Sequence, residues 1–150
     1  MDVAQIKYFA EESIGIVKQM GVKLLEIEPR RVVMQMPLKP ENVNHFQTMY
    51  AGVQFTLAEV MGGALMMATF NLSDHVPIVG KFEITFIKPV STSLTAELSL
   101  TREQVEDVKA QLAAANKAQF ETSTELVNQE GVVCAIGKAK YYLIAKSDLA

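Results

Sequence analysis

Residues 51–70 have the sequence AGVQFTLAEVMGGALMMATF and carry apolar side chains on nearly every face of a helix. A helix that is apolar all round is a core helix, because no face of it is suited to water. Gly62 and Gly63 stand side by side within it, and each costs about 1 kcal/mol relative to alanine in a helix interior. Close backbone packing against a sheet or a partner would explain both glycines. The stretch therefore predicts a central helix wrapped by a sheet.

Patterning on either side of this helix predicts the other elements of one domain, residues 1–150. Apolar residues recur at spacings of three and four over residues 3–20, which predicts an amphipathic helix that Gly21 ends. Alternating or β-rich runs predict strands at 22–27, 31–36, 78–88, 94–100, 118–127 and 132–144. A Thr-x-x-Gln capping box at Thr101 predicts a short helix to about Ala114. This order of elements predicts an α+β fold.

The length, charge and apolar patterning of the chain argue against several classes of protein. A chain of 150 residues is long enough to bury its own core, and no repeat or linker divides it. The net charge of −3, with scattered basic residues, gives no electrostatic footprint for nucleic acid. The acidic N-terminal segment lacks the features of a secretory signal, and no run approaches the ~18 apolar residues of a membrane span. We therefore expect a soluble, cytoplasmic protein, with Cys134 as a buried core residue.

Glu59 is the only acidic residue between Asn42 and Ser73, a stretch that also lacks lysine and arginine. Burying a carboxylate costs solvation, so a scaffold would be better served by an apolar residue. Two interpretations stay open. Glu59 is a functional carboxylate, with Gln54 and Thr56 as candidate contacts to a substrate, or it is structural, on a polar stripe with those two residues or paired with a base from elsewhere.

Gly52 lies at the expected N-terminus of the same helix, where backbone N–H groups lack intrahelical partners and the helix dipole attracts negative charge. Glycine also permits close approach of a ligand, so the Gly52 N–H is a candidate donor to an oxyanion. Glu59 lies seven residues further on, ~10 Å along the helix axis. A second subunit could supply the partner that one chain does not place within reach.

The spacing Asn44-x-x-x-x-x-Tyr50-Ala51-Gly52-x-x-x-x-Leu57-Ala58-Glu59 resembles, without gaps, the hotdog thioesterase motif N-x-x-G-x-x-H-G-G-x-x-x-x-L-A-D/E. Residues 81–90 and 131–143 are similar to two further strands of that family, and the inserted helix resembles the PaaI-like branch. The resemblance implies a hotdog fold, in which a curved antiparallel sheet wraps a long central helix. It also implies homodimers or homotetramers paired edge to edge, sites at the subunit interface, and no metal or redox cofactor.

The same resemblance implies roles for single residues. Glu59 would activate water or attack the thioester, Gly52 would supply the oxyanion-stabilising amide, and Asn44 would face the acyl group. Tyr50 stands where the family often has histidine, and it either donates a hydrogen bond to substrate or packs as an aromatic at the helix start. His45 acts as an acid or base, or is a solvated loop residue.

Two residues of this loop depart from the family motif, since Ala51 and Gln47 each replace a glycine. Together with Tyr50, they leave the substrate and the rate open.

Hydrolysis of an acyl-CoA type thioester is the favoured function, with Glu59 as general base or nucleophile. A hotdog hydratase or dehydratase would need a paired histidine and acid, which only His45 and Glu59 could supply. A non-catalytic module that binds acyl thioesters or lipids would keep the apolar tunnel without efficient chemistry. We expect coenzyme A only as part of the substrate, and neither nucleic acid nor a membrane as a partner.

Overall fold

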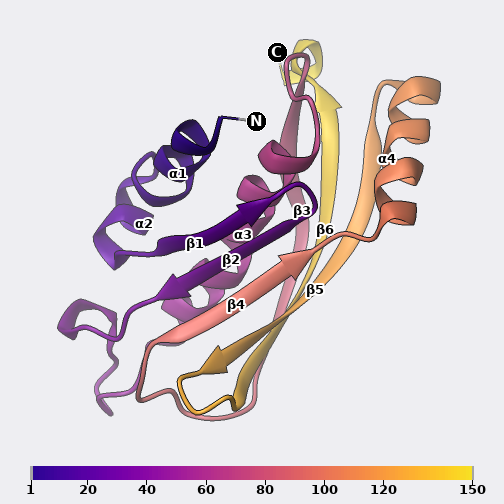
Figure 1. Cartoon of the computed structure of the whole chain (residues 1–150). Coiled ribbons are helices and arrows are strands. Elements are labelled where there is room, and N and C mark those ends of the chain that lie inside the picture. The colour runs from indigo at the N-terminus through magenta and orange to yellow at the C-terminus, as the bar shows by residue number, and fades with distance from the viewer. Residues whose placement is uncertain (1, 150) are drawn as a thin grey trace.

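The computed structural model describes residues 2–149, which form six β-strands and four α-helices in the order shown in Figure 1. Two short 3-10 turns, Pro40–Asn42 and Lys146–Leu149, complete the secondary structure. The main elements are α1 (Val3–Glu11), α2 (Gly15–Met20), β1 (Lys23–Glu28), β2 (Arg31–Met36), α3 (Ala51–Thr69), β3 (His75–Phe86), β4 (Leu94–Ser99), α4 (Arg102–Ala115), β5 (Ala118–Asn128) and β6 (Val133–Ala145).

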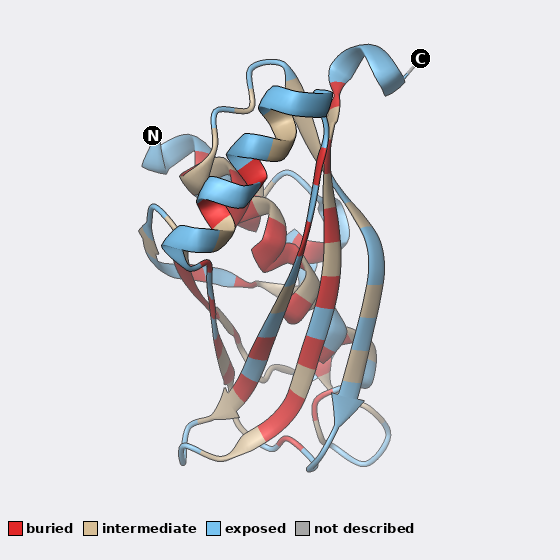
Figure 2. Ribbon diagram, turned by 90° about the vertical axis from the view of Figure 1, so that its right-hand side faces the viewer, coloured by how far each residue is buried: buried red, intermediate tan, exposed pale blue. Residues whose placement is uncertain are grey.

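All six strands belong to one antiparallel sheet with the order β1-β2-β4-β5-β6-β3. The sheet curves around α3, whose buried side chains form the centre of the core (Figures 1 and 2). Buried and exposed positions alternate along β5, and along most of β6, because successive side chains point to opposite faces of a sheet. The inner face packs on α3, and the outer face meets solvent. The predicted α+β arrangement of a long helix wrapped by antiparallel strands is confirmed.

The expectation of one continuous helix over residues 3–20 was wrong. The chain forms α1, breaks at residues 12–14 and continues as α2. The Glu11 side chain turns toward β1, where its carboxylate accepts the backbone N–H of Leu24 at 2.8 Å and lies 3.3 Å from the ammonium of Lys23. The Ser13 hydroxyl donates to the Phe9 carbonyl, a local bond that competes with helix continuation. The break therefore docks α1 onto the sheet.

The sheet opens between β4 and β5, and α4 fills the gap. These strands pair over only three residues of each, and beyond that point α4 runs alongside β5 (Figure 1). Gln104 donates to the Glu121 carbonyl at 3.2 Å, and Gln111 both donates to the Gln119 carbonyl and accepts its N–H. The two glutamines are seven residues apart and so share one helix face. They satisfy backbone groups of β5 that β4 leaves unpaired.

The adjacent glycines of α3 are explained by close packing on two sides. A Cβ at Gly62 would lie 2.1 Å from the phenol Cζ and Oη atoms of Tyr141 in β6, and one at Gly63 would lie 2.8 Å from the ring of Phe9 in α1. The helix therefore touches the sheet and α1 more closely than alanine would allow. The α3 helix is also long and apolar enough to cross a membrane, but 61% of its most apolar 18-residue stretch is buried inside the protein. It is a core helix, as predicted.

Cys134 is confirmed as a core residue. Its side chain is fully buried, and its thiol donates to the Val132 carbonyl.

Candidate functional site

Glu59 lies at the middle of α3 and opens into a small cavity of about 110 Å³ between that helix, β3, β6 and the N-terminal helices. The cavity walls are almost entirely apolar, formed by Phe9, Ile14, Val60, Gly63, Met66, Pro77, Val79 and Tyr141. Within residues 2–149, no hydrogen bond or ion pair holds the Glu59 carboxylate. Burial raises the pKa of Glu59 above its ordinary value, because desolvation disfavours the charged form. A carboxylate in this setting is suited to accept a proton.

Tyr141 is a second polar group of this cavity, and sequence reasoning missed it. Its hydroxyl donates to the backbone carbonyl of Glu59 at 3.3 Å, and its ring stacks on Phe120 with a centroid separation of 5.7 Å. Burial, and then the charge of Glu59, raise the pKa of Tyr141 above its usual range, so the phenol stays protonated. The only signal in the sequence was indirect, since Gly62 leaves the space that the phenol fills.

A second cavity, of about 310 Å³, lies at the N-terminal end of α3. Its lining residues come from the loop before α3, the first turn of α3, and the end of β3 with the chain that follows it. They are Asn44, Thr48, Met49, Ala51, Gln54, Phe86, Ile87, Lys88 and Pro89. The Gln54 side chain is 95% buried, and its amide nitrogen donates to the Met49 carbonyl at 3.1 Å. The amide oxygen of Gln54 has no partner among the described residues.

Asn44 lines this cavity and also holds the loop together. Its side-chain oxygen accepts the backbone N–H groups of Phe46 and Thr48, at 2.9 and 3.2 Å, and its amide donates to the Thr48 hydroxyl at 3.0 Å. Gln47, which replaces a motif glycine, has a φ of +61°. Left-handed backbone favours glycine, so the loop keeps the glycine geometry with a different residue.

The N-terminal turn of α3 leaves the Gly52 N–H without a hydrogen-bond partner in the described part of the chain. The Tyr50 ring lies against this turn, since a Cβ at Gly52 would come within 2.6 Å of its Cε1 atom. Tyr50 is itself 57% exposed. An aromatic ring therefore covers one side of the glycine, and the amide remains available to a ligand.

Four predicted site residues line neither cavity, namely Gly52, Tyr50, Thr56 and His45. The Thr56 hydroxyl donates to the Gly52 carbonyl within the helix at 2.8 Å. His45 is exposed, with its ring 3.9 Å from that of Phe46. Within one chain the structure thus brings together Asn44 and Gln54 but leaves Glu59 in a separate cavity. It does not form the pair of His45 and Glu59 that a hydratase would need.

Both cavities reach the edge strand β3, which pairs only with β6 on its other side. Pro77 and Val79 of β3 border the Glu59 cavity, while Phe86 and Ile87 border the cavity at the start of α3. Large apolar side chains are exposed along this edge and beside it, namely Phe46, Tyr50, Phe55, Ile78, Phe86 and Ile87. A long, apolar, unpaired edge is typical of a surface that pairs with another strand.

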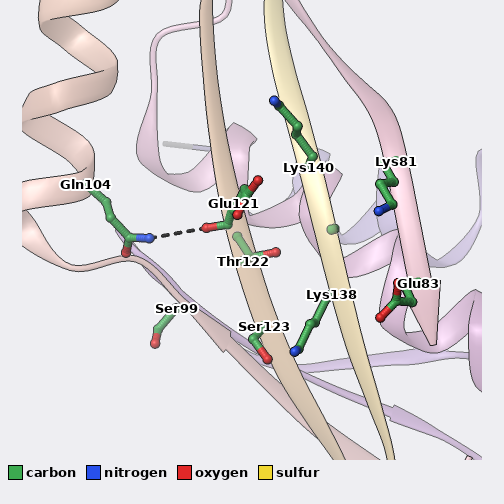
Figure 3. A pocket seen from close by; sticks show the side chains of 10 residues that line it. Lys81, Glu83, Ser99, Gln104, Glu121, Thr122, Ser123, Lys138 and Lys140 are labelled. Atoms are coloured by element: carbon green, nitrogen blue, oxygen red, sulfur yellow. Dashed lines mark hydrogen bonds between the residues drawn. The ribbon is translucent and has the colours of Figure 1, made fainter. Parts of the chain in front are cut away.

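A larger hollow, of about 710 Å³, lies on the outer face of the sheet beside α4 (Figure 3). Charges of both signs are interspersed across its strands, since Lys140 lies between Lys81 and Glu121, and Lys138 lies between Glu83 and Ser123. Figure 3 shows these side chains spread along three strands rather than directed at one point. The hollow is a solvated polar face without the convergent groups of a binding site.

Among residues 2–149, no three histidine, cysteine, aspartate or glutamate side chains are grouped so as to hold a metal ion. The absence of a metal or redox cofactor from the reaction stays a prediction.

The family model described as a domain of unknown function, DUF4442, matches residues 4–143. A Pseudomonas aeruginosa protein of unknown function, PA5026, described as a probable thioesterase, has a TM-score of 0.90 and 30% identity, with 97% of each chain covered. No curated protein sequence gives a significant match.

More distant structures share the fold. A protein of unknown function from Chlorobaculum tepidum, OLEI01261, has a TM-score of 0.82 and 16% identity, covering 95% of this chain and 94% of its own. The Haemophilus influenzae thioesterase HI1161 has a TM-score of 0.71 and 15% identity, covering 89% and 85%. These similarities confirm the hotdog fold that the motif predicted.

Proposed function

We propose that this chain, which belongs to the DUF4442 family and has the hotdog fold, hydrolyses acyl thioesters of the coenzyme A type. The observation that carries the proposal is the Glu59 carboxylate, which lies in an apolar cavity with a raised pKa and has no partner among residues 2–149. A structural carboxylate would be expected to have a cation or several donors around it. The description of PA5026 as a probable thioesterase supports the same activity.

In the proposed reaction, Glu59 takes a proton from water as the water oxygen attacks the thioester carbonyl. The Gly52 N–H and the dipole of α3 stabilise the oxyanion of the tetrahedral intermediate. The C–S bond then breaks, and the departing thiolate recovers the proton from Glu59. Direct attack by Glu59, with hydrolysis of the resulting anhydride, is the second route. Tyr141 remains protonated beside Glu59 and would help to orient the attacking water.

We further propose that the site is formed by two subunits. Antiparallel pairing of two β3 strands about a two-fold axis near Phe82 would set Ile78 opposite the partner's Phe86. The Glu59 cavity, which borders Pro77 and Val79, would then face the partner's cavity at the start of α3. Such pairing would cover the exposed apolar edge of β3 and bring a base from one chain to an amide of the other.

Hydrolysis of a panel of acyl-CoAs by the wild type and by Glu59→Gln tests the activity. We expect thiol release by the wild type and its near loss in the variant, with the fold and ligand binding retained. Binding of acyl-CoA without hydrolysis by either protein would instead favour the non-catalytic binding module. Hydration of the acyl chain by the wild type, lost in Glu59→Gln and without thiol release by either protein, would favour a hydratase.

A mixing experiment tests the two-subunit site. Glu59→Gln and Gly52→Val are each expected to be inactive alone. In a mixed dimer, one site carries both lesions and the other carries neither. Random reassembly should therefore restore about one quarter of wild-type activity, since half of the dimers are mixed and each has one intact site. No recovery, with mixed dimers present by native mass spectrometry, would place Glu59 and its oxyanion donor in the same chain.

A further inference from the structure

We propose that Gln54 selects thioesters that carry a hydrogen-bond donor, an N–H or O–H group, positioned to enter the cavity at the start of α3. The inference rests on the proposed hydrolysis and adds a statement about which substrates are preferred. It concerns an acceptor in the wall of the cavity and not the reacting atoms, so Gln54 is a specificity residue rather than a catalytic one.

The orientation of the Gln54 amide follows from its surroundings. The side chain is 95% buried, and its nitrogen lies 3.1 Å from the Met49 carbonyl oxygen. Reversing the amide would set two acceptor oxygens against each other, so the nitrogen must face Met49. The Gln54 oxygen therefore points away from Met49, and no described residue donates to it. A buried acceptor without a donor is unfavourable, and a ligand that supplies the donor is correspondingly favoured.

The rest of the cavity makes this acceptor selective. The side chains of Asn44 and Thr48 hydrogen-bond to each other, and Asn44 also bonds to the loop backbone. Apolar groups of Met49, Phe86 and Pro89 form much of the remaining wall. A hydrogen bond in such surroundings is stronger than in water, and an acceptor that goes unmatched costs more. Among the described residues that line this cavity, Gln54 is thus the one with a buried side-chain oxygen that lacks a hydrogen-bond donor.

The size of the cavity fits a short segment of substrate. About 310 Å³ is near the lower end of small-molecule pockets. Two parts of an acyl-CoA could supply the donor, namely an amide N–H of the thiol arm or a hydroxyl of the acyl chain. Both present the same chemistry to Gln54, and pairs of substrates distinguish them.

The test uses two matched pairs of thioesters. For the thiol arm, S-butyryl-N-acetylcysteamine is compared with its N-methylated amide, which lacks the N–H. For the acyl chain, 3-hydroxybutyryl-CoA is compared with butyryl-CoA. The readout is the ratio of kcat/KM within each pair, for the wild type, Gln54→Met and the control Gln35→Met. Gln35 is a suitable control because it lies in β2, lines neither cavity and donates only to Thr95.

We expect the wild type and Gln35→Met to favour the donor-bearing member of one pair by about tenfold. In Gln54→Met that ratio should fall to about one. The pair that responds identifies the source of the donor. A preference that persists in Gln54→Met would be steric and would overturn the proposal. So would equal rates for both members of both pairs in the wild type, which would mean that water alone satisfies Gln54.

Failure of the proposed activity gives a different result. If the wild type hydrolyses none of the four thioesters, they become stable ligands, and titration calorimetry measures their dissociation constants. A tenfold preference in binding that is lost in Gln54→Met would then support the role of Gln54 in a binding module. Equal binding within both pairs, or no binding at all, would overturn it. Circular dichroism and melting temperature of each variant exclude a folding defect as the cause.

Discussion

The two cavities along α3 differ in what they contain. The cavity at the middle of the helix holds a carboxylate among apolar walls, and its one other polar side chain is the phenol of Tyr141. The cavity at the start of the helix is larger and offers amide and hydroxyl groups but no carboxylate. The first can accept a proton, and the second can bind and orient a polar ligand. Neither cavity alone has the groups needed for thioester hydrolysis.

This difference indicates how the fold divides the chemistry. One helix carries both functional groups on one face, because Gly52 and Glu59 are seven residues, or nearly two full turns, apart. That spacing keeps the two groups separate within a chain, and in the proposed dimer it would make them complementary between chains paired at β3.

The largest effect is expected at the middle of the helix. Glu59→Gln keeps the size of the side chain but removes its ability to accept a proton or attack as an anion. A general base contributes roughly 10²–10⁴-fold, so kcat should fall by that factor while acyl-CoA binding is retained. Steady-state kinetics and equilibrium binding measure the two quantities. Full kcat in this variant would remove Glu59 from the mechanism.

A smaller loss of kcat is expected when substitutions prevent β3 from pairing with a second copy of the chain. In the double variant Ile78→Glu and Phe86→Glu, like charges would face each other across the proposed two-fold axis. Both side chains are exposed in the chain, so the fold should survive. Separating the subunits would take the Gly52 amide away from Glu59, and loss of one oxyanion donor costs roughly 10²–10³ in kcat.

Sedimentation velocity and thiol release on the same samples check this result. Leu25 is exposed on the other edge strand, β1, and serves as a control. Leu25→Glu should change neither the mass measured by sedimentation nor the rate of thiol release. An active monomer of the double variant would contradict the shared site.

The packing of Tyr141 can be tested with the two adjacent glycines. Gly62→Ala would force a methyl group into the Tyr141 phenol, and overpacking of this kind costs about 1–3 kcal/mol of unfolding free energy. Gly63→Ala meets only the ring of Phe9, which is half-buried and free to shift. The gain in helix propensity, about 1 kcal/mol, should then offset most of the contact. Chemical denaturation of both variants should therefore give a clear loss for the first and little change for the second.

Much of the fold could be predicted from the sequence because the signals were local. Alternation located the strands, and the capping box at Thr101 located α4, whose bonds at Gln104 are present in the structure. The break between α1 and α2 could not be foreseen, since it depends on where Glu11 meets β1. The opening of the sheet beside α4 depends in the same way on contacts between distant segments.

The site was predictable in part for the same reason. Glu59 stands out as an isolated charge in an apolar stretch, and Gly52 by its place at a helix start. Tyr141 lies in an alternating strand and looks like any core aromatic, so its approach to Glu59 emerges only in three dimensions. That Gln54 is buried with an unmatched oxygen likewise depends on the position of Met49 and on the chain after β3.

The smallest expected effect is on the pH dependence of stability, which differs between a carboxylate buried without a partner and one that a partner stabilises. Burial raises the pKa of Glu59 in the folded chain, while in the unfolded chain it keeps the ordinary value of about 4.3. Below that value both states are protonated. As the pH rises, the unfolded state loses its proton first, so the folded state binds more protons and stability falls until Glu59 ionises in both states.

Glutamine resembles the protonated acid at every pH. The melting temperature of Glu59→Gln should therefore match the wild type near pH 4 and exceed it near pH 8, whereas the control Glu130→Gln, at an exposed turn, should show no such difference. A Glu59→Gln protein that melts lower than the wild type near pH 8 would mean that a cation from a second subunit pairs with the carboxylate, and the cavity would then be a binding site for that cation rather than for the reacting water.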